Sequence, residues 1–284
     1  MGSASDSLRS VLSGHWSIEP PLVLALGLVT IVYVCGWLHL RERRPDRASL
    51  WRLGAFVAGL SVVFVALASP LDTFADRRLV LHMAQHLLLL VVAPSLIVLG
   101  SPTMPLLLGL PTGRVRATVG ALLTRVVDYF RNPLLGLTAM SLAMWGWHWP
   151  SAFELAVRSP GWHVVEHTSF LGAGLLFWWP VVEPWPSRSR WPRWAMIPYL
   201  LLADVQNTAL AALLVFSDRV LYPSYAGGGS PLDDQAAAGV LMWVPMSLAY
   251  LGPAAVLTAR LLAPRGPTVR AAVGPPRSPA MIAG

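Results

Sequence analysis

Seven long apolar runs dominate this 284-residue chain and restrict the folds open to it. The runs occupy residues 21–40, 51–69, 79–100, 133–149, 162–182, 194–216 and 236–262. A helix needs about 20 consecutive apolar residues to cross a bilayer, and each run is close to that length. Only 12% of the residues are charged, which is about half the share typical of soluble domains. The sequence therefore predicts an all-α integral membrane protein with a bundle of seven transmembrane helices.

The positive charges predict the orientation of this bundle. All 21 basic residues are arginines. If the N-terminus lies outside, sixteen of them fall in cytoplasmic segments and five in outer segments, as the positive-inside rule expects. We therefore expect the N-terminus outside and the C-terminus in the cytoplasm of a multi-pass protein of a bacterial plasma membrane. Because topology and the lipid bilayer account for the net charge of +7, no nucleic-acid partner is expected.

The predicted topology divides the chain into three parts. Residues 1–20 form an extracytoplasmic segment, and residues 21–262 form the membrane domain. Residues 263–284 form a cytoplasmic tail rich in Pro, Arg and Ala, which we expect to be disordered.

Five of the seven histidines share one depth in this topology. His82 and His86 open the third apolar run, His163 and His167 open the fifth, and His148 closes the fourth. Residues four apart lie on one face of a helix, and all five histidines fall near the outer face. Ionisable side chains that face inward in a membrane helix mark functional sites, and imidazole binds copper, zinc, iron and nickel. The sequence therefore predicts a metal site at the outer face.

Four further side chains lie close to these histidines along the chain. Met83 and Met144 carry thioethers, which would favour Cu(I), although Met also fills apolar cores. Asp72 follows the second run and Asp234 precedes the seventh. These carboxylates would either orient the imidazoles or serve at helix ends.

The segment from His163 to His167 also fits the H-x-x-E-H pattern of some zinc proteases. The pattern is short, and a protease would also need an open metal site and a path for peptide. Glu166 is one residue from His167, hence about 100° away around a helix. We expect Glu166 to face Arg158 or the lipid headgroups instead.

Three polar residues lie in the middle of the sixth run, Asp204, Gln206 and Asn207. A carboxylate at that depth is costly and should face the bundle interior. It would serve either a polar pathway or a hydrogen bond between helices.

A series of short motifs runs in order from residue 69 to residue 246. The series comprises Ser69-Pro70-Leu71-Asp72, His82-Met83-Ala84-Gln85-His86, Leu99-Gly100-Ser101-Pro102, Trp147-His148-Trp149-Pro150, Glu166-His167, Phe177-Trp178-Trp179-Pro180, Leu221-Tyr222-Pro223-Ser224-Tyr225 and Met242-Trp243-Val244-Pro245. In this order the motifs resemble the polytopic CtaG-type assembly factors of caa-type cytochrome c oxidases. The resemblance implies a role in maturing a copper-containing oxidase, with copper handled at the outer face.

The expected function is that of a metallochaperone for cytochrome c oxidase assembly, not of an enzyme. We expect copper to bind His82, His86, His148 and His167, with His163 added from its spacing. The expected partners are oxidase subunits and an extracytoplasmic copper chaperone. Two alternatives remain open at this point: a transporter that moves copper across the membrane, and a haem-binding redox protein with histidines as axial ligands.

Overall fold

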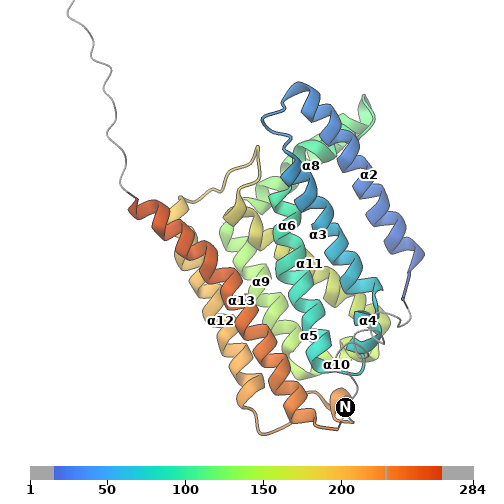
Figure 1. Ribbon diagram of the computed structural model, residues 1–284, viewed down its shortest axis with the longest axis vertical. Coiled ribbons are helices and arrows are strands. Elements are labelled where there is room, and N and C mark those ends of the chain that lie inside the picture. Colours follow the sequence, from blue (N-terminus) through green and yellow to red (C-terminus); the bar gives the residue numbers. More distant parts are fainter. Residues whose placement is uncertain (1–15, 228, 264–284) are drawn as a thin grey trace, which may run out of the picture.

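The computed structural model describes residues 16–227 and 229–263. Most of the predicted outer segment and nearly all of the predicted disordered tail therefore lie outside the described residues. Within the described ranges the regular structure is entirely helical, without a strand. Long helices pack side by side along the vertical axis of Figure 1, with α8 at one end and α4 and α10 at the other.

All seven predicted apolar runs are helical. Six of them are α2 (Pro20–Arg43), α3 (Leu50–Ala68), α9 (Pro133–His148), α11 (Pro160–Val182), α12 (Met196–Phe216) and α13 (Pro231–Leu262). The third run consists of α5 (Leu79–Leu87), a π-helical turn η1 (Leu88–Val92) and α6 (Ala93–Leu99). The turn η1 ends two residues before Pro94, whose missing N–H interrupts the regular helical hydrogen bonds.

Shorter helices occupy segments that the hydropathy pattern leaves as loops. They are α4 (Pro70–Ala75), α7 (Thr103–Gly109), α8 (Arg114–Phe130), α10 (Pro150–Arg158) and the 3-10 turn η3 (Pro223–Tyr225). A further 3-10 turn, η2 (Arg193–Ala195), directly precedes α12 at the start of the sixth run. Local signals explain several of their boundaries. Proline stands in the first turn of α4, α9 and α10, where its fixed φ fits and no N–H is needed. Ser69 and Asn132 accept backbone N–H groups at the starts of α4 and α9.

Five helical segments are long and apolar enough to cross a membrane: α2, α3, Leu79–Leu99, Arg193–Phe216 and α13. Helices α9 and α11 are not among these five, although both belong to the same bundle. With 16 residues, α9 is about 24 Å long, less than the roughly 30 Å of a hydrocarbon core. The predicted seven spans and their orientation therefore stay predictions.

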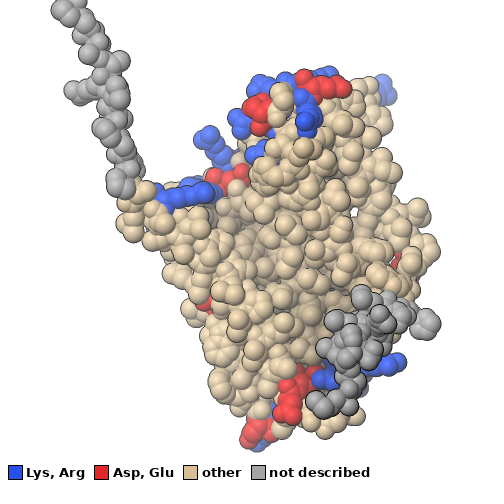
Figure 2. All heavy atoms as spheres, viewed as in Figure 1, with Lys and Arg blue, Asp and Glu red and all other residues tan. Residues whose placement is uncertain are grey.

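The surface and the interior have the polarity expected in a bilayer. In Figure 2 the charged side chains gather at the two ends of the molecule, and the broad band between them carries few. Leu28, Leu142 and Leu248 are exposed, whereas His86 and Glu166 are buried. Because lipid solvates leucine but not a carboxylate, this distribution supports a protein that crosses a membrane.

Close packing of α11 against the η1 turn positions the first half of α11. A Cβ atom at Gly174 would overlap the Leu90 carbonyl oxygen and would lie 2.6 Å from the Pro94 ring. Glycine is therefore required here for a close backbone approach, as at many helix contacts in membranes. This approach brings the side chains near residue 167 towards those of α5.

We expect Gly174→Ala to lower the free energy of unfolding by about 1 to 3 kcal/mol, because the added methyl overpacks this contact. Gly172→Ala is the matched control, since a Cβ at Gly172 would meet no atom within 4 Å. Thermal unfolding of both variants in detergent checks the prediction. Equal unfolding temperatures for the two variants would contradict it.

Candidate metal centre

Helices α5 and α11 bring the two predicted histidine pairs together. The ring centroids of His82 and His163 are 5.4 Å apart, and those of His86 and His167 are 5.8 Å apart. His82, His86 and His167 are buried, and His163 is half-buried. Four imidazoles from two helices therefore share one buried volume at the end of the bundle near α4 and α10.

Glu166 lies between these imidazoles, and the expectation that it faces Arg158 or the headgroups is wrong. The residue has no exposed surface. Its Oε2 is 3.7 Å from His82 Nε2, and its Oε1 is 3.5 Å from His86 Nε2. Neither carboxylate oxygen has a hydrogen-bond partner among the described residues. A buried carboxylate without donors is stabilised by a nearby cation or by taking up a proton.

One ion can reach four side chains of this cluster. Ligand atoms of His82, His163, Glu166 and His167 all lie within 4.8 Å of one another. A central point then lies within about 3 Å of each atom, against about 2.0 to 2.2 Å for a bonded nitrogen or oxygen ligand. Small side-chain movements would close this difference. We call these four residues the His/Glu cluster; its donors suit Cu(II), Zn(II) or iron.

Hydrogen bonds determine which nitrogen of His82 is free to bind an ion. The Tyr225 hydroxyl lies 2.9 Å from the Ala75 carbonyl oxygen and 3.2 Å from His82 Nδ1. A carbonyl can only accept, so the single hydroxyl proton goes to Ala75 and His82 Nδ1 is the donor to Tyr225. In the neutral ring Nε2 then carries the lone pair. This lone pair faces the Glu166 carboxylate, an arrangement that a cation would stabilise.

His148 lies beside the His/Glu cluster, not in it. Its ring centroid is 5.8 Å from that of His86. Its Nδ1 lies 2.7 Å from the Met144 carbonyl oxygen, and its Nε2 lies 3.3 Å from Met83 Sδ. Of the two predicted methionines, Met83 thus contacts an imidazole through its sulfur, and Met144 does so through its backbone.

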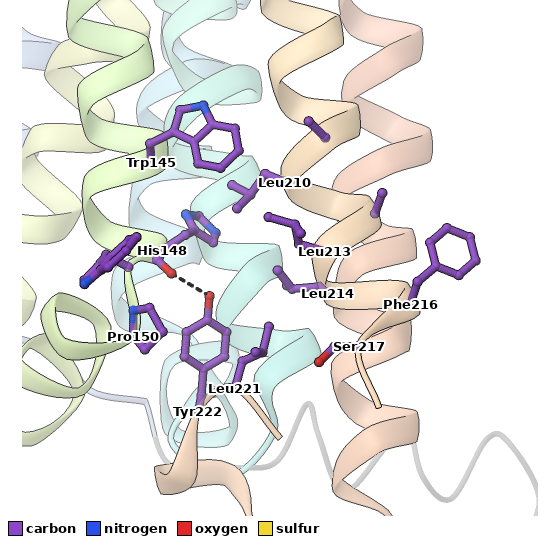
Figure 3. A pocket seen from close by; sticks show the side chains of 13 residues that line it. Trp145, His148, Pro150, Leu210, Leu213, Leu214, Phe216, Ser217, Leu221 and Tyr222 are labelled. Carbon is purple, nitrogen blue, oxygen red and sulfur yellow. Dashed lines mark hydrogen bonds between the residues drawn. The ribbon is translucent and has the colours of Figure 1, made fainter. Parts of the chain in front are cut away.

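An apolar cavity of about 470 Å³ borders His148 on the flank of the bundle. Figure 3 shows this cavity between α9, α12 and the segment after α12, with Trp145, Leu213 and Phe216 in its wall. The Tyr222 hydroxyl closes one side, donating to the His148 carbonyl oxygen at 3.0 Å. An apolar surface therefore borders the group of histidines at His148.

The two predicted aspartates form hydrogen bonds with residues in or directly before α5. Asp234 accepts hydrogen bonds from the Leu79 amide at 2.7 Å and from Arg78 Nε at 3.1 Å, so it holds the first turn of α5. Asp72 accepts from Gln85 Nε2 at 2.9 Å. Burial raises the pKa of the Asp72 carboxyl, and the Gln85 hydrogen bond partly opposes that rise. Asp234 thus has the helix-end role, and Asp72 reaches α5 through Gln85.

The turn η3 packs against the His/Glu cluster through Tyr225, which contacts His82, and it is tied to α10. Glu154 accepts from the Ser224 amide at 3.0 Å and from the Ser224 hydroxyl at 2.7 Å. It also pairs with Arg158 at 2.7 Å, which is therefore not the partner of Glu166. Burial raises the pKa of the Glu154 carboxyl, but the bonds from Ser224 and Arg158 outweigh it and leave the pKa below the ordinary 4.5.

We expect the attachment of η3 to depend on this carboxylate. Because the pKa of Glu154 is lowered in the folded state, its stabilisation is present above about pH 4.5 and is lost as the pH falls below that value. At pH 7 Glu154→Gln should raise hydrogen exchange in residues 221–227 by about tenfold relative to wild type. This difference should vanish in acid. A difference that persists below pH 3 would contradict the role of the charge.

The polar residues in the middle of α12 have separate surroundings. Asn207 Nδ2 donates to the Met242 carbonyl oxygen at 3.2 Å and so joins α12 to α13; the expectation of such a bond between helices concerned Asp204. Asp204 Oδ1 is buried and has no hydrogen-bond partner among the described residues.

Two residues of the site, Glu166 and Tyr225, are missed by reasoning from the sequence. The signal for Glu166 is its spacing of three residues from His163, which places both on one helix face. Tyr225 lies in one of the motifs quoted above, but its contact with Ala75 joins segments 150 residues apart. No local pattern predicts such a contact.

Comparison with known proteins places the chain in a family. It is 25% identical over 247 residues to Uncharacterized protein Mb0105 of Mycobacterium bovis and to Uncharacterized protein MT0111 of Mycobacterium tuberculosis. It is 24% identical over 242 residues to Uncharacterized protein ML1998 of Mycobacterium leprae. Each alignment covers 80% of this chain and 36% of the relative, so the chain spans about a third of the length of these relatives. No solved structure matches it.

A family model gives the assignment directly. The model of the cytochrome c oxidase caa3 assembly factor matches residues 31–263. This range contains all five histidines of the site, together with Glu166 and Tyr225. The chain belongs to the family of cytochrome c oxidase caa3 assembly factors.

Proposed function

We propose that this chain binds copper in the His/Glu cluster and assists its delivery to a cytochrome c oxidase. The proposal includes the seven-helix topology in a bacterial plasma membrane, with the N-terminus and the site on the outer side. The family supplies the link to the oxidase. The described geometry supplies the candidate site.

The observation that carries the proposal is the environment of Glu166. Its carboxylate is fully buried, has no hydrogen-bond donor in the described structure and faces two imidazole nitrogens. At such a position a bare negative charge is costly. A bound copper ion would neutralise the charge and would use the free lone pair of His82.

Delivery needs no chemical turnover by the chain, so no enzyme activity is proposed. Copper enters from the outer side, where η3 packs against the cluster. Displacement of Tyr225 from His82 would open that side, and ligands of the recipient would then replace the imidazoles one at a time. An oxidase subunit is the proposed recipient, and an extracytoplasmic copper chaperone is the proposed donor.

Two observations weigh against the alternative functions. Beyond His86 the same helix continues with buried Leu89, Leu90 and Val91, which offer no ligand to an ion crossing the membrane. The imidazoles of α5 and α11 also pack close to one another, with the ring centroids of His82 and His163 5.4 Å apart and those of His86 and His167 5.8 Å apart. This packing leaves no slot for a haem between them.

The test is oxidase maturation in a bacterial strain that lacks this chain. We expect a chain with His82→Ala and His86→Ala to leave the assembled oxidase without its copper and without activity. His39→Ala is the control, because His39 is an exposed residue of α2. Normal copper content in the oxidase with the double variant, at wild-type levels of the variant, would overturn the proposal.

A further inference from the structure

A thioether and an imidazole meet beside the His/Glu cluster at a distance that suits either an N–H···S hydrogen bond or a shared ion, depending on the tautomer of the imidazole. Met83 Sδ lies 3.3 Å from His148 Nε2. Both residues are buried, and Met83 has no exposed surface. The contact joins α5 to α9 at the depth of the other histidines.

The protonation of His148 follows from its second contact. Nδ1 lies 2.7 Å from the Met144 carbonyl oxygen, and a carbonyl can only accept, so Nδ1 carries a proton. In the neutral ring Nε2 is then a bare lone pair that faces the lone pairs of sulfur. Full protonation would instead bury an imidazolium without a carboxylate bonded to it, because the oxygens of Glu166 face His82 and His86.

A metal ion bound by both atoms would remove this conflict. An imidazole nitrogen about 2.0 Å and a sulfur about 2.3 Å from one ion in tetrahedral geometry are about 3.5 Å apart. The observed separation of 3.3 Å is close to that value. Thioether and neutral imidazole together form a soft donor set, which selects Cu(I) over divalent ions.

His86 supplies a third donor next to this pair. Its ring centroid is 5.8 Å from that of His148. Both of its ring nitrogens are buried without a hydrogen-bond partner among the described residues. It is not one of the four residues of the His/Glu cluster. Its Nε2 faces Glu166 Oε1 at 3.5 Å, which leaves Nδ1 for an ion held by Met83 and His148.

We propose that Met83, His148 and His86 form a second metal site, selective for Cu(I), beside the His/Glu cluster. This proposal rests on the proposed function and deepens it: the chain has one site with carboxylate and imidazole donors and one with a thioether. The two sites differ in the ion that they prefer, and no electron transfer is part of the proposal. The apolar cavity bordered by His148 lies beside the second site only.

The test is X-ray absorption at the copper edge on the full chain, purified in detergent and loaded with Cu(I) under reducing conditions. We expect a sulfur scatterer at about 2.3 Å from copper in wild type. Met83→Leu should remove it and weaken Cu(I) binding by about tenfold or more, since even partners outside a ligand set change affinity about 10- to 100-fold. Met144→Leu is the matched control, because Met144 is equally buried but contacts His148 through its backbone.

A second measurement does not depend on the folding of a variant. Protein with selenomethionine in place of methionine should replace copper–sulfur scattering by copper–selenium scattering. A first shell of nitrogen and oxygen alone in wild type, or equal effects of Met83→Leu and Met144→Leu, would overturn the second site.

Titration with Co(II), a spectroscopic probe for divalent ions, separates this result from the proposed function. Co(II) binding that is lost in Glu166→Gln, with no sulfur near Cu(I), would refute the second site and leave the His/Glu cluster standing. Binding of neither ion would refute both.

Discussion

Glu166→Gln should lower the affinity of the purified protein for Cu(II) by about a hundredfold or more. The carboxylate is the only acidic group in the His/Glu cluster, and it is fully buried. Breaking a buried charge pair by removing one partner costs about 3 to 5 kcal/mol, and each 1.4 kcal/mol is about tenfold in affinity. Competition titration against a chelator of known affinity measures the loss.

The stability of the metal-free protein distinguishes this role from a structural one. If the buried Glu166 carboxylate serves to bind an ion, its charge destabilises the protein when that ion is absent. Metal-free Glu166→Gln should therefore unfold at a higher temperature than metal-free wild type. Glu42→Gln is the control, since Glu42 is an exposed residue of α2 and is not a member of the cluster. If Glu166→Gln binds Cu(II) normally and unfolds at a lower temperature, Glu166 is a structural ion-pair partner.

Tyr225→Phe should weaken copper binding by about 10- to 100-fold, the usual effect of losing a group that orients a metal-binding histidine. The Tyr225 oxygen keeps the proton of His82 on Nδ1, which leaves Nε2 free for the ion. Without that acceptor the proton can occupy Nε2, and the ring can turn away from Glu166. The same titration measures the change.

The variant Tyr222→Phe distinguishes the loss of His82 orientation from a general loosening of the η3 segment. Tyr222 belongs to the same segment, but its hydroxyl donates to the backbone of His148 and not to an imidazole. We expect this variant to bind copper within a few-fold of wild type. Equal losses in the two variants would show that the packing of the segment matters and that the Tyr225 hydrogen bond has no separate effect.

Much of the bundle can be predicted from the sequence because the hydropathy of a segment depends only on the consecutive residues of that segment. Each of the seven apolar runs is helical, and the run at 79–100 matches the helical stretch Leu79–Leu99. The spacing of four residues predicts that His82 and His86 share a face with each other, as His163 and His167 do. The arginine pattern places both pairs at one end of the bundle, and the structure brings them together.

The position of Glu166 shows where this reasoning stops. Its angle to His167 on a helical wheel is large, but the wheel does not say which helix packs against which face. The close approach of α11 to η1 at Gly174 decides that. Since this approach depends on a π-helical turn and on the absence of one methyl group, periodicity alone does not predict it.

The position of the turn η3 depends on contacts between segments that are far apart in the sequence. The turn η3 is held by Glu154 at Ser224 and by Ala75 at Tyr225, and these partners lie 70 and 150 residues away. Helix α8, unlike η3, can be predicted from its own residues. The alternation of arginines with apolar residues at positions 114–130 is a local amphipathic signal.

The most direct test of the central claim is the copper content of the detergent-purified protein after loading, measured with its optical spectrum. Wild type should retain copper. The variant with His82→Ala and His86→Ala should retain none in the His/Glu cluster. Circular dichroism of this variant checks that its fold is intact. A wild-type protein that retains no copper, or a double variant that retains as much as wild type, would contradict the account. A haem spectrum lost in the double variant would replace copper handling by a redox function.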